Sequence, residues 1–163
     1  MNGGDNKIPI GIQTFEEIIS GGYKYVDKTG FVYKLATVYK YVFLSRPRRF
    51  GKSLLSSTFQ AYFSGRKDLF NNLEAGKLEK EWKQHPVFYF DMSTAKHMTE
   101  AQLLEEMDKK LYEYEQTYGR GVKDVNINQR LEGLVHRATE QTGEKAVIII
   151  DEYDAPLLDV IND

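Results

Sequence analysis

One stretch, residues 41–55 (YVFLSRPRRFGKSLL), constrains the fold of this chain more than any other feature. It opens with a β-branched and aromatic run, which favours a strand over residues 41–44. A basic turn closes on Gly51-Lys52-Ser53, and the residues that follow have the apolar spacing of a helix. A strand, a glycine-containing turn and a helix, in that order, predict a loop whose backbone binds phosphate.

The residue types in this loop suit a triphosphate. Backbone N–H groups at a helix N-terminus bind anions, and the helix dipole assists them. Gly51 lets the main chain approach closely, Lys52 supplies a positive charge for the β- and γ-phosphates, and Ser53 offers a hydroxyl to Mg²⁺. The predicted nucleotide-binding residues are Arg48, Arg49, Phe50, Gly51, Lys52, Ser53 and Leu54, and Lys52 is also a predicted catalytic residue.

The loop departs from the full phosphate-loop pattern, G-x-x-x-x-G-K-[ST], at its first position. Arg46 stands where that pattern has its first glycine. The run Arg46-Pro47-Arg48-Arg49 also permits a simpler interpretation as a basic patch. Its position between two apolar elements favours the phosphate loop over that patch.

Residues 147–154 (VIIIDEYD) form the second informative stretch, an apolar strand that ends in carboxylates. Asp151 is the predicted acidic partner of Mg²⁺, beside Ser53. Glu152 is the predicted catalytic residue that polarises the attacking water. The structural alternative is a core strand followed by a helix that Asp154 caps, and both interpretations can hold together.

These stretches carry a family resemblance. YVDKTGF (residues 25–31), LSRPRRFGKSLL (44–55) and IIIDEYDAPL (148–157) resemble the AAA-ATPase-like family of bacterial proteins, over about residues 10–158. The resemblance implies ATP and Mg²⁺ as cofactors, with Lys52 and Ser53 as the Walker A residues. It implies Asp151 and Glu152 as the Walker B pair. It also implies that Arg46, in place of the first glycine, is the family's own variant of the phosphate loop. Such proteins often carry a C-terminal PD-(D/E)xK nuclease-like domain.

The expected fold is α/β, a P-loop NTPase-type three-layer sandwich with a mostly parallel sheet. Strands at residues 41–44, 87–90 and 147–150 alternate with helical patterns, as a parallel sheet requires. We expect residues 1–9 to be disordered and residues 10–163 to be the N-terminal part of the ATPase-like domain, truncated after the Walker B strand. Exposed sheet edges would then favour a homo-oligomer.

Composition limits the partners. The net charge is −2, so phosphate affinity must be local, and nucleic acid is expected only through a domain beyond this chain. The absence of cysteine excludes disulfides and thiol chemistry and is compatible with a cytoplasmic location. The three histidines show no metal-ligand spacing, and no apolar run is long enough to span a membrane.

The sequence therefore predicts Mg²⁺-dependent ATP binding and hydrolysis that couples nucleotide state to conformation. Two alternatives stay open: a nucleotide-binding switch without hydrolysis, and a nucleic-acid-processing module. The roles of the arginines are open as well. Arg48 or Arg49 could bind phosphate, act as an arginine finger on a neighbouring subunit, or pair with Asp27, Asp91 or Asp154.

Overall fold

The computed structural model describes residues 7–45, 50–95 and 98–153, which form two compact units. Unit 1 covers Met1–Lys83 and unit 2 covers Gln84–Asp163. The described part is a mixed α/β structure with one small parallel sheet. Arg46, Pro47, Arg48, Arg49 and Asp154 lie outside the described residues, as do residues 1–6 of the segment expected to be disordered.

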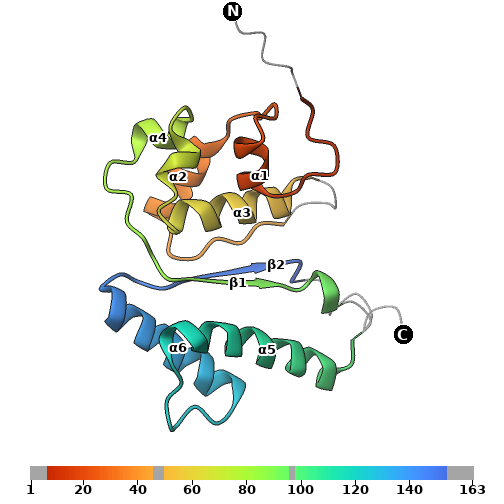
Figure 1. Ribbon diagram of the computed structural model, residues 1–163, viewed down its shortest axis with the longest axis vertical. Helices are drawn as coiled ribbons and strands as arrows, with labels where there is room; N and C mark the ends of the chain where they lie inside the picture. The colour runs from red at the N-terminus through yellow and green to blue at the C-terminus, as the bar shows by residue number, and fades with distance from the viewer. Residues whose placement is uncertain (1–6, 46–49, 96–97, 154–163) are drawn as a thin grey trace, which may run out of the picture. The chain divides into compact units, whose positions relative to one another are not determined.

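Unit 1 is helical in its described residues (Figure 1). Its core is an aromatic cluster around Phe15, Phe70 and Tyr62, and the helix that follows Ser53 is the one predicted by its apolar spacing. Trp82 packs against this cluster with an unusual positive φ of 46°. The elements are α1 (Phe15–Ser20), α2 (Thr29–Val38), α3 (Lys52–Phe63), the short 3₁₀ helix η1 (Lys67–Phe70) and α4 (Glu74–Leu78).

The strand predicted over residues 41–44 is wrong for the described structure. These residues take no strand conformation, and Tyr41 and Phe43 are 82% and 75% exposed. A β-branched and aromatic run becomes a strand only where a neighbouring strand pairs with it, and the described residues of unit 1 contain no such strand. The sequence pattern identified an apolar segment correctly, but the strand pairing that it predicted is not found among the described residues.

Unit 2 is an α/β layer in which two helices cover one face of a parallel pair of strands (Figure 1). Phe88 and Phe90 of the first strand are buried against Leu111, Leu134 and Ala138 of the helices. This arrangement confirms the predicted parallel pairing for these two strands. The elements are β1 (Val87–Asp91), the 3₁₀ helix η2 (Ser93–Ala95), α5 (Glu100–Tyr118), α6 (Ile127–Thr142) and β2 (Val147–Asp151).

The helix-facing side of β2 is less covered than its apolar sequence predicts. The register pairs Phe88 with Ile148 and Phe90 with Ile150, so all four side chains share one face. Phe88 and Phe90 are buried, whereas Ile148 and Ile150 are 45% and 53% exposed. The helices α5 and α6 thus cover the β1 side of this face and leave the β2 side open.

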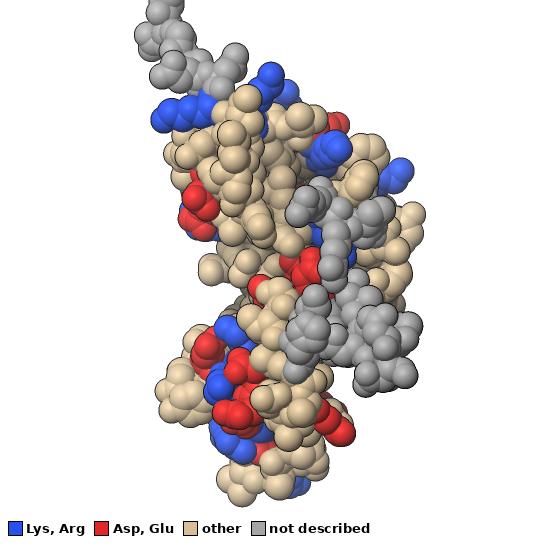
Figure 2. All heavy atoms as spheres, turned by 90° about the vertical axis from the view of Figure 1, so that its right-hand side faces the viewer, with Lys and Arg blue, Asp and Glu red and all other residues tan. Residues whose placement is uncertain are grey.

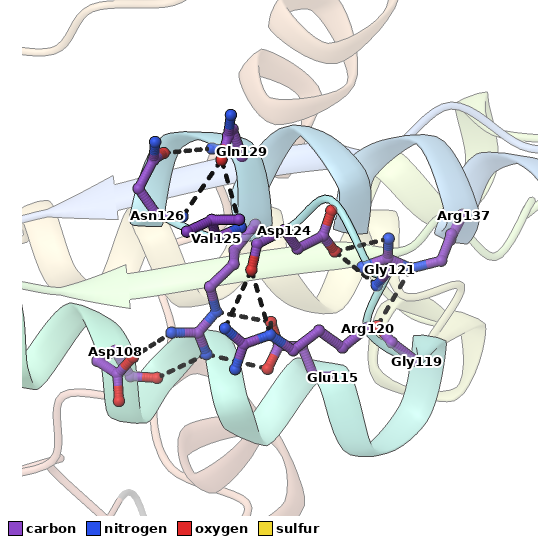
Figure 3. A network of polar contacts seen from close by, with 11 residues as sticks. Asp108, Glu115, Gly119, Arg120, Gly121, Asp124, Val125, Asn126, Gln129 and Arg137 are labelled. Carbon is purple, nitrogen blue, oxygen red and sulfur yellow. Dashed lines mark hydrogen bonds and ion pairs between the residues drawn. The ribbon is translucent and has the colours of Figure 1, made fainter.

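A buried ionic network joins α5 to α6 (Figure 3). The Arg130 and Glu115 side chains are each only 3% exposed, and they pair through two hydrogen bonds of 2.7 and 2.9 Å. Arg130 also binds the exposed Asp108. In the connecting loop, Asp124 accepts from Arg137 and from the Gly121 amide, each at 2.8 Å. The apolar periodicity of the two helices gave no sign of these contacts.

Candidate functional site

Gly51 is the residue at which the predicted phosphate loop becomes helix. It is the N-cap of α3 in the left-handed conformation, with φ 73° and ψ 29°. A Cβ built at this position would meet no atom within 4 Å. Glycine is therefore favoured here by backbone conformation, and the space around its Cα is open among the described residues.

The first turn of α3 begins without a capping side chain. The Gly51 carbonyl accepts from the Leu55 amide at 3.0 Å, while the preceding amides of the turn have no acceptor one turn earlier in the helix. The turn contains no acidic residue and begins with Lys52. The helix dipole is positive at this end, so an anion bound there is stabilised.

The two longest described helices satisfy their first backbone amides with their own side chains. Both α5 and α6 begin with a complete capping box, built by Thr99 with Gln102 and by Asn126 with Gln129. At the start of α3 a glycine replaces the capping side chain. The Ser53 hydroxyl has no hydrogen-bond partner in the described part of the chain, so it stays available to a ligand.

Contacts with α1 hold the start of α3 in place. Ser57 accepts a hydrogen bond from the Phe15 amide at 2.9 Å and donates to the Leu54 carbonyl at 2.9 Å. Thr58 donates to the same carbonyl at 2.7 Å. Leu54 packs on the unit 1 core, whereas Phe50, on the other side of Gly51, is largely exposed. The helix end is thus fixed on a packed scaffold.

The motif YVDKTGF links two other helix ends. Asp27 accepts from the Thr29 amide at 2.8 Å, the Thr29 hydroxyl at 2.7 Å and the Glu74 amide at 2.7 Å. Thr29 in turn accepts from the Ala75 amide at 3.0 Å. A side chain at Gly30 would collide with the Glu74 carboxyl group. Asp27, Thr29 and Gly30 thus join the N-termini of α2 and α4.

The pKa of Asp27 follows from these contacts. Partial burial works against its charge, but the hydrogen bonds from Thr29 and Glu74, with the charge of Lys77, bring its pKa below the ordinary value of 3.8. The ionised carboxylate is therefore part of the fold of unit 1.

Asp151 ends β2 in a nearly enclosed position, with 5% of its surface exposed. Its Oδ2 atom accepts from the Tyr89 hydroxyl at 3.0 Å, and its Oδ1 atom accepts from the Glu152 amide at 3.0 Å. Glu152 follows with a positive φ of 52°, which is uncommon for a residue other than glycine. Such backbone outliers concentrate at functional sites.

Sequence reasoning missed the neighbours of Asp151. The register places Asp91 beside Asp151, so both strands end in a carboxylate on the same face. The exposed Asp91 accepts from the Ser93 amide at 2.8 Å, at the start of η2. The matched strand endings, VFYFD and VIIID, could have revealed this pairing. Nothing in the periodicity could have revealed the Tyr89 contact.

The structure brings the predicted site residues together in two groups. Phe50, Gly51, Lys52, Ser53 and Leu54 share one turn in unit 1. Asp151 and Glu152 share one strand end in unit 2. The predicted phosphate ligands Arg48 and Arg49 lie outside the described residues.

The Ser53 hydroxyl and the Asp151 and Glu152 carboxylates carry hard oxygen atoms, the donors that Mg²⁺ prefers. In the described ranges, no three His, Asp or Glu side chains converge into a metal site. Mg²⁺ needs no such cluster, because it commonly takes one or two protein ligands and completes its shell with phosphate oxygens and water. None of the described helices has the length and apolar character needed to cross a membrane.

Comparison with known proteins bears on the whole chain. A family model described as AAA-ATPase-like, "Predicted AAA-ATPase", matches residues 9–163. This chain belongs to the AAA-ATPase-like family. The match confirms the resemblance of the three motifs and extends to the last residue. It does not reach a nuclease-like domain, which stays a prediction.

One relative in the AAA-ATPase-like family is an "Uncharacterized protein in vnfD 5'region" from Azotobacter chroococcum mcd 1. It is 39% identical over 155 residues, which is 94% of this chain and 30% of the relative. The chain thus spans about a third of the length of the curated relative that it matches. No solved structure matches the chain.

Proposed function

We propose that this chain forms the phosphate-binding and Mg²⁺-binding part of a P-loop ATPase. The observation that carries the proposal is the start of α3: a left-handed glycine, no capping side chain, and a turn that opens with Lys52 and Ser53. A helix end of this composition is stabilised by an anion. The family description, a predicted AAA-ATPase, names the nucleotide to test first.

The residues divide the work as follows. Arg48, Arg49 and the amides of residues 50–54 bind the phosphates, and Lys52 adds its charge at the β- and γ-phosphates. Ser53 and Asp151 would hold Mg²⁺, which would supply positive charge that offsets the negative charge of the phosphates. Glu152 orients and deprotonates the attacking water. This division requires the turn at Gly51 and the end of β2 to meet in the active protein, and that meeting is part of the proposal.

The proposed fold is the three-layer P-loop sandwich, of which residues 10–163 supply the N-terminal part. The incomplete cover over Ile148 and Ile150 supports this proposal, because a sandwich needs a further strand and helix beside β2. In the relative, most of the chain lies outside the matched segment and has room for such elements.

The decisive experiment is a binding titration of ATP with Mg²⁺ against the parent protein and its Lys52→Ala variant. We expect the variant to lose most of its affinity, because Lys52 starts the uncapped turn. Lys123→Ala, an exposed lysine in unit 2, is the matched control and should bind as the parent does. Equal affinity of the parent and Lys52→Ala would refute the phosphate-binding assignment.

Glu152→Gln separates hydrolysis from switching. A hydrolase should lose ATP turnover by a factor on the order of 10² and keep its ATP affinity, because the amide cannot act as a base. A switch without hydrolysis should change little in either measurement. The experiment belongs in the full-length protein, where turnover can be measured first.

The nucleic-acid alternative has weaker support in the described surface. On the face drawn in Figure 2, acidic and basic side chains are intermixed over unit 2. On α5, Lys109 pairs with Glu105 and Glu106, and Lys110 pairs with Glu113. A phosphodiester-binding surface needs uncompensated cations. Strongly salt-dependent DNA or RNA binding that ATP does not displace would favour the nucleic-acid module over the ATPase.

A further inference from the structure

Tyr89 connects the middle of β1 to the acidic end of β2. The register pairs Tyr89 with Ile149, so Asp151 lies two residues further along the neighbouring strand and on the same face. The tyrosine ring is long enough to reach this diagonal neighbour, and its hydroxyl donates to the Asp151 Oδ2 atom at 3.0 Å.

The backbone of Tyr89 is itself fixed from α5. The Tyr114 hydroxyl accepts from the Tyr89 amide at 2.7 Å and donates to the Tyr89 carbonyl at 3.1 Å. The Tyr114 ring packs edge-on against Phe88, with 4.9 Å between ring centroids. A chain of packed and hydrogen-bonded groups therefore runs from α5 through β1 to the Asp151 carboxylate.

We propose that Tyr89 is a positioning residue that sets the orientation of the Asp151 carboxylate toward the Mg²⁺ of bound Mg-ATP. This inference rests on the proposed function. Among the described residues, one hydrogen bond reaches each carboxylate oxygen, from the Tyr89 hydroxyl and the Glu152 amide. Rotation of the carboxylate would break both bonds, so its remaining lone pairs point in fixed directions.

The chemical type of the donor matters. A lysine or arginine in place of Tyr89 would neutralise the carboxylate and weaken its attraction for a cation. The tyrosine hydroxyl is neutral, so it orients Asp151 and leaves its negative charge intact. The simpler alternative is that the bond only satisfies a buried carboxylate, as buried polar groups generally require.

The test is calorimetric titration of ATP into the parent protein and the Tyr89→Phe variant, once with Mg²⁺ and once with EDTA. Partners that orient a metal ligand typically contribute on the order of tenfold or more to metal affinity. We expect Tyr89→Phe to bind ATP about tenfold more weakly than the parent with Mg²⁺ and equally well in EDTA. If the Tyr89 hydroxyl only supplies a hydrogen bond to a buried carboxylate, Mg²⁺ should increase the ATP affinity of the variant as much as that of the parent.

Tyr118→Phe is the matched control. Its ring packs on Phe88 at 5.8 Å between centroids, and its hydroxyl has no hydrogen bond within the described residues. It should match the parent in both titrations. Should Tyr89→Phe fail to fold, Tyr114→Phe takes its place. That variant frees the Tyr89 backbone and should lower affinity several-fold with Mg²⁺ only.

The outcomes separate this inference from the proposed function. A parent protein that gains no ATP affinity from Mg²⁺ would refute both. A parent that shows the gain, with Tyr89→Phe retaining all of it, would refute only the role of Tyr89. An equal loss with Mg²⁺ and with EDTA would also overturn that role, because it would indicate a general structural effect.

Discussion

Gly51 and Gly143 hold nearly the same left-handed backbone, with φ of 73° and 72°, at the N-cap of α3 and the C-cap of α6. A Cβ at either position would meet no atom within 4 Å. The two residues therefore share a conformational requirement and differ in their surroundings. Only Gly51 stands at the proposed phosphate-binding turn.

This pair supports a prediction at the residue scale. Gly51→Ala and Gly143→Ala should each lower the free energy of unfolding by about 1 kcal/mol, because alanine is strained in the left-handed region. Only Gly51→Ala should also weaken ATP binding. Urea denaturation and ATP titration of both variants check this. Weakened ATP binding in both would mean that strain alone, at any helix end, accounts for the effect.

At the scale of elements, Asp27 couples α2 to α4 through a carboxylate whose pKa lies below 3.8. A depressed pKa stabilises the fold fully above the unfolded value and loses that contribution as the pH falls through the lower folded value. Asp27→Asn should therefore melt at a lower temperature than the parent near neutral pH. The difference should shrink below about pH 4.

Thermal melts followed by circular dichroism over a series of pH values measure this difference. The other carboxylates with lowered pKa, such as Asp68 and Asp124, are present in both proteins, so their contribution cancels. A gap between parent and variant that stays constant into acid would show that the charge of Asp27 has no part in the coupling.

The pair Arg130 and Glu115 gives a second prediction at the scale of elements. Arg130→Met should lower the free energy of unfolding by about 3–5 kcal/mol, because it leaves the buried Glu115 carboxylate, among the described residues, with only the more distant Arg120, at 3.9 Å. The double variant Arg130→Met with Glu115→Leu should recover most of that loss, since no buried charge remains. Urea denaturation measures both.

An exposed ion pair on α5 is the control for this prediction. Lys109→Met removes the contacts with Glu105 and Glu106, all of them well exposed. The change should stay below about 1 kcal/mol. A double variant as unstable as Arg130→Met alone would show that Arg130 acts through its packing, with the charge of little importance.

These elements also show how far the sequence could predict the structure. Helices α3, α5 and α6 followed from apolar spacing because burial of one face decides where a helix packs. Residues 41–44 were wrongly predicted as a strand because strand formation depends on a neighbour that periodicity cannot supply. The pairing of Arg130 with Glu115 was not predicted, since it depends on how the consecutive helices α5 and α6 pack against each other.

The candidate site was predictable to a similar degree. Gly51, Lys52 and Ser53 could be placed at a helix start because the motif itself contains the turn and the helix that follows. The bond from Tyr89 to Asp151 depends on strand register, which only the folded sheet determines. Arg48 and Arg49 remain predictions, because they lie outside the described residues.

At the scale of the whole molecule, the sheet of unit 2 has two different edges. At the outer edge of β1, the Tyr114 hydroxyl occupies both the amide and the carbonyl of Tyr89. At β2, Ile148 and Ile150 remain about half exposed. Further strands can therefore join the sheet beside β2, whereas Tyr114 blocks their addition at Tyr89.

We expect the 163-residue chain to self-associate through the β2 side of its sheet. Ile148→Lys should shift the chain toward the monomer in analytical ultracentrifugation, because a charge there opposes burial of the apolar edge. Val122→Lys, at a fully exposed apolar residue in the loop between α5 and α6, is the control and should leave the distribution unchanged. An equal shift in both variants would point to net charge as the cause.

Trp82 gives the protein a built-in optical probe. It is the sequence's one tryptophan, and its ring lies 5.1 Å from that of Phe70 and 5.6 Å from that of Tyr62, between centroids. Indole emission shifts to longer wavelength when water reaches the ring, so red-shifted fluorescence will follow the melting of unit 1 alone. Circular dichroism follows both units, and any lag between the two signals would reveal that they unfold separately.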